Sequence, residues 1–146
     1  MGTFLDSQSS QNSTANGQIS IPVTATPTLF GTLGLNLAGA GTNPRVTFSI
    51  SAAFTSLATV LTPIVVNVYR VVNGTPSLIY SATQTLAVAG LGLASTTVLS
   101  FNGADYNPIA QTTFPIYRAT INVAGGVVLF PTRTGPETFY AAAYSD

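Results

Sequence analysis

Few residues of this chain have side chains that could carry out chemistry. The 146 residues include no Cys, His, Lys or Trp, and the carboxylates are Asp6, Asp105, Glu137 and Asp146. Without His or Lys, nothing activates a Ser or Thr hydroxyl, and without Cys there is no thiol nucleophile. A glycosidase needs two carboxylates that flank one bond, and nothing around Asp105 and Glu137 indicates such a pair. We therefore predict that the protein has no catalytic residues and is not an enzyme.

Metal and cofactor sites have little support in the sequence. Zinc and iron–sulfur sites use Cys or His ligands, so calcium is the metal left to consider. The segment from Asn102 to Asn107 offers one carboxylate and two amides, whereas a protein calcium site needs about six to eight oxygens and usually several carboxylates. A plain turn before Pro108 is the simpler interpretation. We predict no metal and no cofactor.

The chain carries very little charge. Four arginines and four acidic residues make up 5% of the sequence and cancel, whereas about 25% of a typical soluble domain is charged. Four scattered arginines do not form a surface for nucleic acid or anionic lipid. The longest apolar run, residues 86–94, is too short to span a bilayer. We predict no nucleic-acid or membrane partner, and a surface that favours association.

Residues 1–18 are expected to form an arm outside a β domain at residues 19–146. The start of the chain has neither the basic residues nor the apolar segment of a secretory signal. Residues 7–18 are polar and of low complexity, and the apolar pair Phe4 and Leu5 precedes them. Such a segment is flexible unless it is held in place. Two arrangements would hold it: folding back on its own domain, or docking on a neighbouring subunit as an added strand.

The segment from Pro63 to Gln84 has the pattern of two strands joined by Asn73-Gly74. This pair favours a type I′ turn, which needs positive φ at both central residues, and a two-residue turn would set Val68 opposite Ile79. The residues expected to face the core from the first strand are Val65, Asn67, Tyr69 and Val71. The opposite side has more apolar residues than a face toward water needs, so we expect a second copy to cover it. These residues are Ile64, Val66, Val68 and Ile79.

The rest of the chain also reads as short strands separated by Gly, Pro and Asn turns. The segment from Arg45 to Phe54 alternates most regularly, with its large apolar residues on one side. Gly125-Gly126 is expected to be a second hairpin turn, between strands at residues 112–123 and 127–131. Further strands are expected at residues 19–24, 33–37, 96–101 and 137–145, with a looser crossover at residues 86–95.

The number of strands and the absence of helical periodicity predict an all-β fold. Eight or nine short strands indicate an antiparallel β-sandwich, and this number favours a jelly-roll-like arrangement. An immunoglobulin-like Greek key is the alternative, although the chain lacks the Cys and Trp that mark such domains.

Both expected hairpins carry a Tyr-Arg pair, Tyr69-Arg70 and Tyr117-Arg118. These arginines are either exposed and solvated or paired with a carboxylate. The candidate partners are Asp6, Asp105 and Glu137. The tyrosines are either half-buried strand residues or part of a sugar or protein site.

A self-assembling structural subunit accounts for the low charge, the apolar residues on both sides of the hairpin and the lack of catalytic groups. An arm strand added to a neighbour's sheet would satisfy an open sheet edge, and such a contact gives a filament or a closed ring. The expected donor is Phe4 with Leu5, and the expected acceptor is the hairpin face described above or the edge at Ile19, Ile21 and Val23. The alternative is a trimeric jelly-roll tip domain that binds a sugar or protein receptor.

Three stretches carry a family resemblance. They are TPTLFGTLGLNLAGAG (residues 26–41), FNGADYN (residues 101–107) and TGPETFYAAAYSD (residues 134–146). From about Ile21 to Asp146 the chain is similar to small proteins of the Bacillus spore surface, such as exosporium protein C and its relatives. The chain lacks the Cys of crosslinked spore appendage subunits and the Gly-x-y repeats of collagen-like spore filaments.

The resemblance implies a structural component of the exosporium or of a spore appendage. Such a protein would be made in the mother-cell cytoplasm without a signal peptide. Its partners would be copies of itself and other spore-coat or exosporium proteins.

Overall fold

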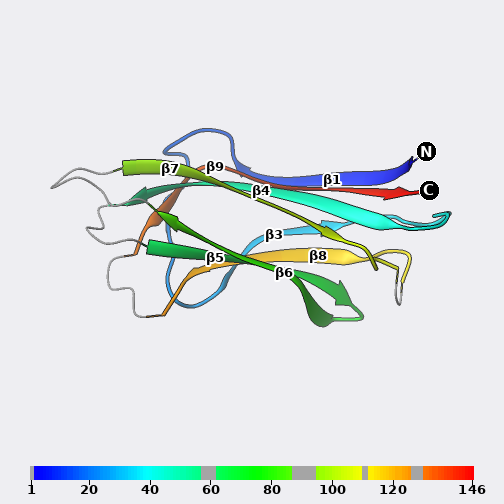
Figure 1. The fold of residues 1–146 in the computed structure, drawn as a ribbon. Helices are drawn as coiled ribbons and strands as arrows, with labels where there is room; N and C mark the ends of the chain where they lie inside the picture. Colours follow the sequence, from blue (N-terminus) through cyan, green and yellow to red (C-terminus); the bar gives the residue numbers. More distant parts are fainter. Residues whose placement is uncertain (1, 57–61, 87–94, 110–111, 126–129) are drawn as a thin grey trace.

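The computed structural model describes residues 2–56, 62–86, 95–109, 112–125 and 130–146, which form two antiparallel sheets (Figure 1). The strands are β1 (Thr3–Ser13), β2 (Ile21–Pro22), β3 (Thr28–Gly34), β4 (Arg45–Ser56), β5 (Thr62–Val72), β6 (Thr75–Leu86), β7 (Ser95–Asp105), β8 (Ile116–Val123) and β9 (Thr132–Ser145). One sheet has the order β1-β9-β4-β7, with β2 also paired to β9, and the other has the order β3-β8-β5-β6. None of the described residues is helical, so this part of the chain has no helix able to cross a membrane.

The strand order is that of a jelly roll. Apart from β2, the first strand pairs with the last, β3 with β8, β4 with β7 and β5 with β6, as in one long antiparallel ribbon. Rolling this ribbon brings β9 beside β4 and β8 beside β5, which completes the two sheets. The predicted all-β, jelly-roll-like sandwich is therefore confirmed, and the immunoglobulin-like alternative is not the observed topology.

The hydrophobic core lies between the two sheets. Strand β4 shows how the sequence produces it, because successive side chains of a strand point to opposite faces. Its regular alternation directs one apolar row inward, and each member of this row is at most 3% exposed. The row consists of Val46, Phe48, Ile50, Ala52 and Phe54.

The turn between β5 and β6 has the predicted geometry. Asn73 and Gly74 both have positive φ, 50° and 78°, as a type I′ turn requires. The predicted register holds from the turn as far as Tyr69 opposite Leu78. A bulge then leaves Ile79 without a directly opposite residue, so Val68 pairs with Tyr80 and not with Ile79.

Strand β5 turns the opposite face to the core from the one predicted. Val65, Asn67 and Tyr69 are only half-buried, and of the expected inward residues only Val71 is buried. The expected assembly face is instead inside the subunit, because Ile64, Val66 and Val68 are at most 1% exposed. Ile79 is partly buried and packs against the same core. Since both faces of this strand are apolar, alternation alone does not identify the inner one.

The predicted second hairpin, around Gly125-Gly126, is wrong because β8 does not pair with the next described strand. Strand β8 pairs with β3 and β5, whereas β9 lies in the other sheet, so the chain crosses between sheets after β8. The expected strand at residues 127–131 and the crossover at residues 86–95 fall largely outside the described residues. Gly-Gly is a weaker register signal than Asn-Gly because glycine accepts many turn conformations.

The expected arm is the first strand of the sandwich. Strand β1 pairs with β9 from Thr3 opposite Ser145 to Ser13 opposite Glu137, so the expected boundary at residue 18 does not separate an arm from the domain. The chain takes the first of the two arrangements considered and folds back on itself. Its polar composition suits an edge strand, because only one of its sides contacts a neighbouring strand.

The positive φ of Gly74 gives a test of the turn. We expect Gly74→Ala to lower the free energy of unfolding by about 1 to 2 kcal/mol, because an L-residue is strained at this φ. Gly125→Ala is the matched control, since a Cβ there meets nothing within 4 Å and no left-handed φ is involved. Urea unfolding of both variants measures the difference, and equal midpoints would show that the turn does not require glycine.

Candidate functional site

The two Tyr-Arg pairs lie directly opposite each other on neighbouring strands. In the β5–β8 register Tyr69 faces Arg118 and Arg70 faces Tyr117. Because side chains alternate between the faces of a strand, Arg70 and Tyr117 share the inner side of the sheet. Tyr69 and Arg118 share the outer side. One sequence feature thus contributes to two separate sites.

On the inner side, Arg70 and Tyr117 both bind the carboxylate of Asp105. The Arg70 Nη1 lies 2.9 and 2.7 Å from the two carboxylate oxygens, and the Tyr117 hydroxyl donates to Oδ2 at 2.8 Å. Asp105 is at the end of β7, so this cluster joins the two sheets. Of the two alternatives considered for the arginines, pairing with a carboxylate therefore holds for Arg70, and exposure to solvent holds for Arg118.

The surroundings of Tyr117 make its ionisation unfavourable. Burial raises the pKa of this phenol far above its usual range, and the negative charge of Asp105 and the hydrogen bond to it act in the same direction. Arg70 opposes these effects only in part. Tyr117 therefore serves as a neutral hydrogen-bond donor to Asp105.

Asp105 is also bound within its own turn, where the backbone N–H of Asn107 donates to Oδ1 at 2.9 Å. Its carboxylate thus accepts hydrogen bonds from three residues, Arg70, Tyr117 and Asn107. This is the carboxylate that the calcium site considered from the sequence would have used. Within the described residues, no group of three or more Cys, His, Asp or Glu is close enough to hold a metal.

A second buried ion pair joins Arg133 and Glu137 within β9. Arg133 Nε donates to Glu137 Oε2 at 2.9 Å, and Nη2 donates to Oε1. Four residues of extended strand would span about 13 Å, and the pairing of β9 with β4 is irregular between these two residues. This irregularity contains Gly135, whose φ is 81°. It shortens the strand and lets the two side chains meet.

The β9 pair also connects the two sheets. The amide of Asn12, on β1, donates to Glu137 Oε1 and to the carbonyl oxygen of Phe30 on β3, both at 2.8 Å. The Arg133 guanidinium lies 5.0 Å from the centre of the Phe30 ring, within range of a cation–π interaction. Glu137 and Arg133 are 0% and 3% exposed, so this cluster is internal.

The structure separates the two carboxylates that a glycosidase would have to bring together. Asp105 lies opposite Val46 and Glu137 lies opposite Ala52 on the same strand, β4. Six strand residues correspond to about 20 Å, whereas paired glycosidase carboxylates are about 5 to 9.5 Å apart. These two residues do not flank one bond.

Two charged side chains of the described residues belong to no ion pair, Asp6 and Arg118. A third pair, Arg45 with Asp146 at 3.1 Å, lies on the surface. The Asp6 carboxylate accepts hydrogen bonds from the backbone amides of Ser7 and Asn36, both at 2.8 Å. Arg118 is exposed and has neither a hydrogen bond nor an ion pair within the described ranges.

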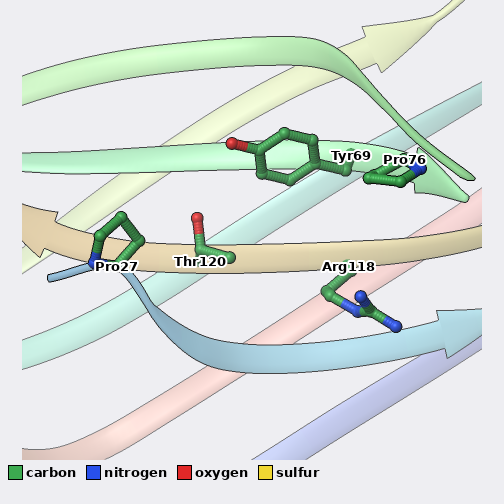
Figure 2. Close-up of a pocket in the computed structure, with 5 residues that line it drawn as sticks. All are labelled: Pro27, Tyr69, Pro76, Arg118 and Thr120. Carbon is green, nitrogen blue, oxygen red and sulfur yellow. The ribbon is translucent and has the colours of Figure 1, made fainter.

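Arg118 belongs to a groove of about 290 Å³ on the outer face of the β3-β8-β5-β6 sheet. Figure 2 shows Thr120 near its centre, with Tyr69 on the side of β5 and Arg118 on the side of β3. Pro27 and Pro76 form its two ends. The groove thus combines one guanidinium, one aromatic ring, two proline rings and the hydroxyls of Tyr69 and Thr120.

Two side-chain atoms on the outer side of β8 are buried without a hydrogen-bond partner in the part of the chain that the structure describes. They are Thr120 Oγ1, in the groove, and Asn122 Oδ1, two residues further along the strand. Buried polar atoms are nearly always paired, so each such exception suggests a partner that the isolated chain does not supply.

The expected assembly residues do not form one surface. Phe4 is 56% and Ile21 is 38% exposed, both on the β1 and β2 edge. Leu5 is partly buried against the core and Ile19 is half-buried. Val23, at 1% exposed, is a core residue and is not available as an acceptor.

Sequence reasoning missed other exposed apolar side chains and the groove itself. The most exposed of the missed residues are Leu29, Leu78, Val98, Tyr106 and Phe114. Only the two Tyr-Arg pairs were visible beforehand as a signal, and their opposition follows from the pairing of β5 with β8, which the sequence did not show.

The raised pKa of Tyr117 predicts how stability depends on pH. We expect Tyr117→Phe to lower the free energy of unfolding by about 1.5 to 3 kcal/mol near neutral pH, since a hydrogen bond to a charged group is lost. Above about pH 10, tyrosine ionises in the unfolded chain but not at position 117 of the folded one. The wild type then loses a stabilising contribution that the variant never had. The difference in the free energy of unfolding between the wild type and Tyr117→Phe should therefore become smaller in urea titrations above about pH 10. A difference that stays constant with pH would contradict the raised pKa of Tyr117.

The buried pair gives a second test of stability. We expect Glu137→Gln to lower the free energy of unfolding by about 3 to 5 kcal/mol, because Arg133 then keeps a buried charge without its partner. The matched control is Asp146→Asn, which removes the exposed pair with Arg45 and should change the unfolding midpoint little. If Glu137→Gln and Asp146→Asn lower the unfolding midpoint in urea equally, burial does not make the Arg133–Glu137 pair the more important one for stability.

Comparison with known proteins identifies the fold and not a family. No protein-family model matches the chain, and no curated protein matches it. The solved structures similar to it include infectious bursal virus derived T=1 particles (10% identity, TM-score 0.59) and the VP2 subviral particle of infectious bursal disease virus (9%, 0.56). Both matches cover 96% of this chain, which spans about a third of those chains, 35% and 32%. At this identity the likeness establishes a shared β-sandwich fold.

Proposed function

We propose that this protein is a non-catalytic structural subunit that assembles with copies of itself. The observation that carries the proposal is the distribution of charge. Six of the eight charged side chains are joined in three ion pairs, and two of these pairs are buried or nearly so. The surface therefore has little charge with which to repel a second copy.

Exposed apolar side chains supply a driving force for association. Tyr106 is 78% exposed, Val98 is 57% exposed, and Phe4, Leu29 and Leu78 are each 56% exposed. Burying such side chains against a neighbour removes apolar surface from water. Four of these residues lie on four different strands and Tyr106 follows β7, so the surface suits contacts with more than one neighbour.

The sheet edges offer a second kind of contact. Strands β1 and β7 are the edges of one sheet, and β3 and β6 are the edges of the other. The outer backbone groups of an edge strand are free to pair with a strand from another chain. The similar solved structures are those of virus-derived particles, which supports an assembling role for this fold without specifying the assembly.

Donation of β1 is the specific mode of assembly that we propose. Strand β1 is an edge strand joined to the rest of the chain by residues 14–20, and among the described strands its one partner is β9. If residues 14–20 straighten, β1 can make the same pairs with β9 of a neighbour. Exchange of an identical element links subunits without requiring a new interface. A spore-surface location rests on the sequence resemblance alone and stays a prediction.

A disulfide lock tests both parts of the proposal. Ser7 lies opposite Ala142 in the β1–β9 register, and the chain has no Cys, so Ser7→Cys combined with Ala142→Cys introduces one defined pair. Directly opposite residues satisfy the distance needed for a disulfide. The assembled variant is oxidised and analysed on a denaturing gel without reductant. Donated strands would give a ladder of covalent multimers.

Light scattering and negative-stain electron microscopy of the wild type provide the independent reading. Covalent monomers from assembled samples would reject strand donation but leave self-assembly intact. Monomers at high concentration in both measurements would reject self-assembly itself. Ser7→Cys alone is the control, because one thiol per chain links at most two chains.

A further inference from the structure

We propose that the groove over Thr120 is a binding site for a small sugar that carries a carboxylate. This inference does not rest on self-assembly, because every residue of the groove comes from one chain. The site is defined by Pro27, Tyr69, Pro76, Arg118 and Thr120 (Figure 2).

The charge of the groove selects an anion. Arg118 is exposed and unpaired in the described structure, and all four carboxylates of the chain belong to the other sheet or follow its last strand. On the sheet that carries the groove, the charged side chains are Arg70 and Arg118, and Arg70 is already bound to Asp105. The outer face of this sheet therefore presents positive charge to a ligand.

The number of donors favours a carboxylate over a phosphate. A guanidinium offers two parallel N–H groups that match the two oxygens of a carboxylate. Arg118 is the single cation of the groove, and the backbone amides at a helix start, a common phosphate-binding device, are absent from the described residues. One arginine with the hydroxyls of Tyr69 and Thr120 fits a singly charged planar group.

Thr120 supplies the second polar contact. Its Oγ1 is buried at the groove and has no partner among the described residues. A hydroxyl both donates and accepts, so a ligand hydroxyl beside it would satisfy an atom that the folded chain leaves unpaired. This requirement points to a ligand with a hydrogen-bonding group at this position, which a sugar hydroxyl supplies.

The remaining walls suit the flat apolar face of a sugar ring. Tyr69 and the two prolines provide ring surfaces around the polar centre. Aromatic side chains combine a broad apolar face with a polar end, which is a recurring feature of small-molecule sites. The volume, about 290 Å³, lies at the lower end of the range of about 300 to 1,000 Å³ for ligand pockets. A single sugar ring is the appropriate size.

Three probes separate the contributions of charge and ring. Saturation-transfer NMR of the full chain is titrated with D-glucuronate, D-glucose and acetate, which carry both features, the ring alone and the charge alone. We expect saturable binding of glucuronate, with glucose and acetate each at least about tenfold weaker. Acetate equal to glucuronate would overturn the ring contact, and glucose equal to glucuronate would overturn the role of Arg118. No saturation by glucuronate would overturn the site.

Variants assign the binding to this groove. We expect Arg118→Gln to weaken glucuronate binding by more than about tenfold, the loss typical of a charge-assisted contact. Thr120→Val keeps the side-chain shape and should weaken binding roughly threefold to tenfold. Arg45→Gln is the matched control, because Arg45 lies on the other sheet and should leave binding unchanged. An equal loss in Arg45→Gln would show nonspecific charge attraction and overturn the assignment.

Discussion

The two sheets of this sandwich are held together at two places by buried charge. Asp105 on one sheet binds Arg70 and Tyr117 on the other, and Glu137 shares Asn12 with the backbone of Phe30 across the same gap. A buried charge is tolerated only with a partner and additional hydrogen bonds. The apolar side chains between these two clusters stabilise the fold through contacts that have no preferred direction. The clusters add directional contacts between the two sheets.

The same pairing shapes the outside of the molecule. Because half of the eight charges are used in the two internal pairs, the surface is rich in Ser, Thr and Asn with scattered apolar side chains. Such a surface attracts copies of itself more readily than it attracts polyelectrolytes. Arg118 is the clear exception among the described residues, and its isolation gives the outer groove a distinct chemistry. A structural subunit and a sugar-binding surface are therefore compatible roles for one chain.

Local signals in the sequence were sufficient where one strong preference acted alone. The Asn73-Gly74 turn and the alternation of β4 were predicted because each has one low-energy solution. The inner face of β5 was not predicted, because both of its faces carry apolar residues and alternation alone does not show that Ile64, Val66 and Val68 face the core. A bulge at Ile79 also changes the register. The groove was also not predictable, because it exists only after β5 and β8 become neighbours and their Tyr-Arg pairs oppose each other.

The adjacency of the first and last strands determines how the subunit responds to force. Strands β1 and β9 run antiparallel with Thr3 opposite Ser145, so both ends of the chain lie side by side (Figure 1). Tension applied between the termini loads these hydrogen bonds one after another, from the ends inward, which opens them like a zipper at low force. Tension along the strands that pulls two neighbouring strands in opposite directions loads many of their hydrogen bonds at once. A layer built from this chain would therefore resist stretching best when its neighbours bind along the length of its strands and not at the chain ends.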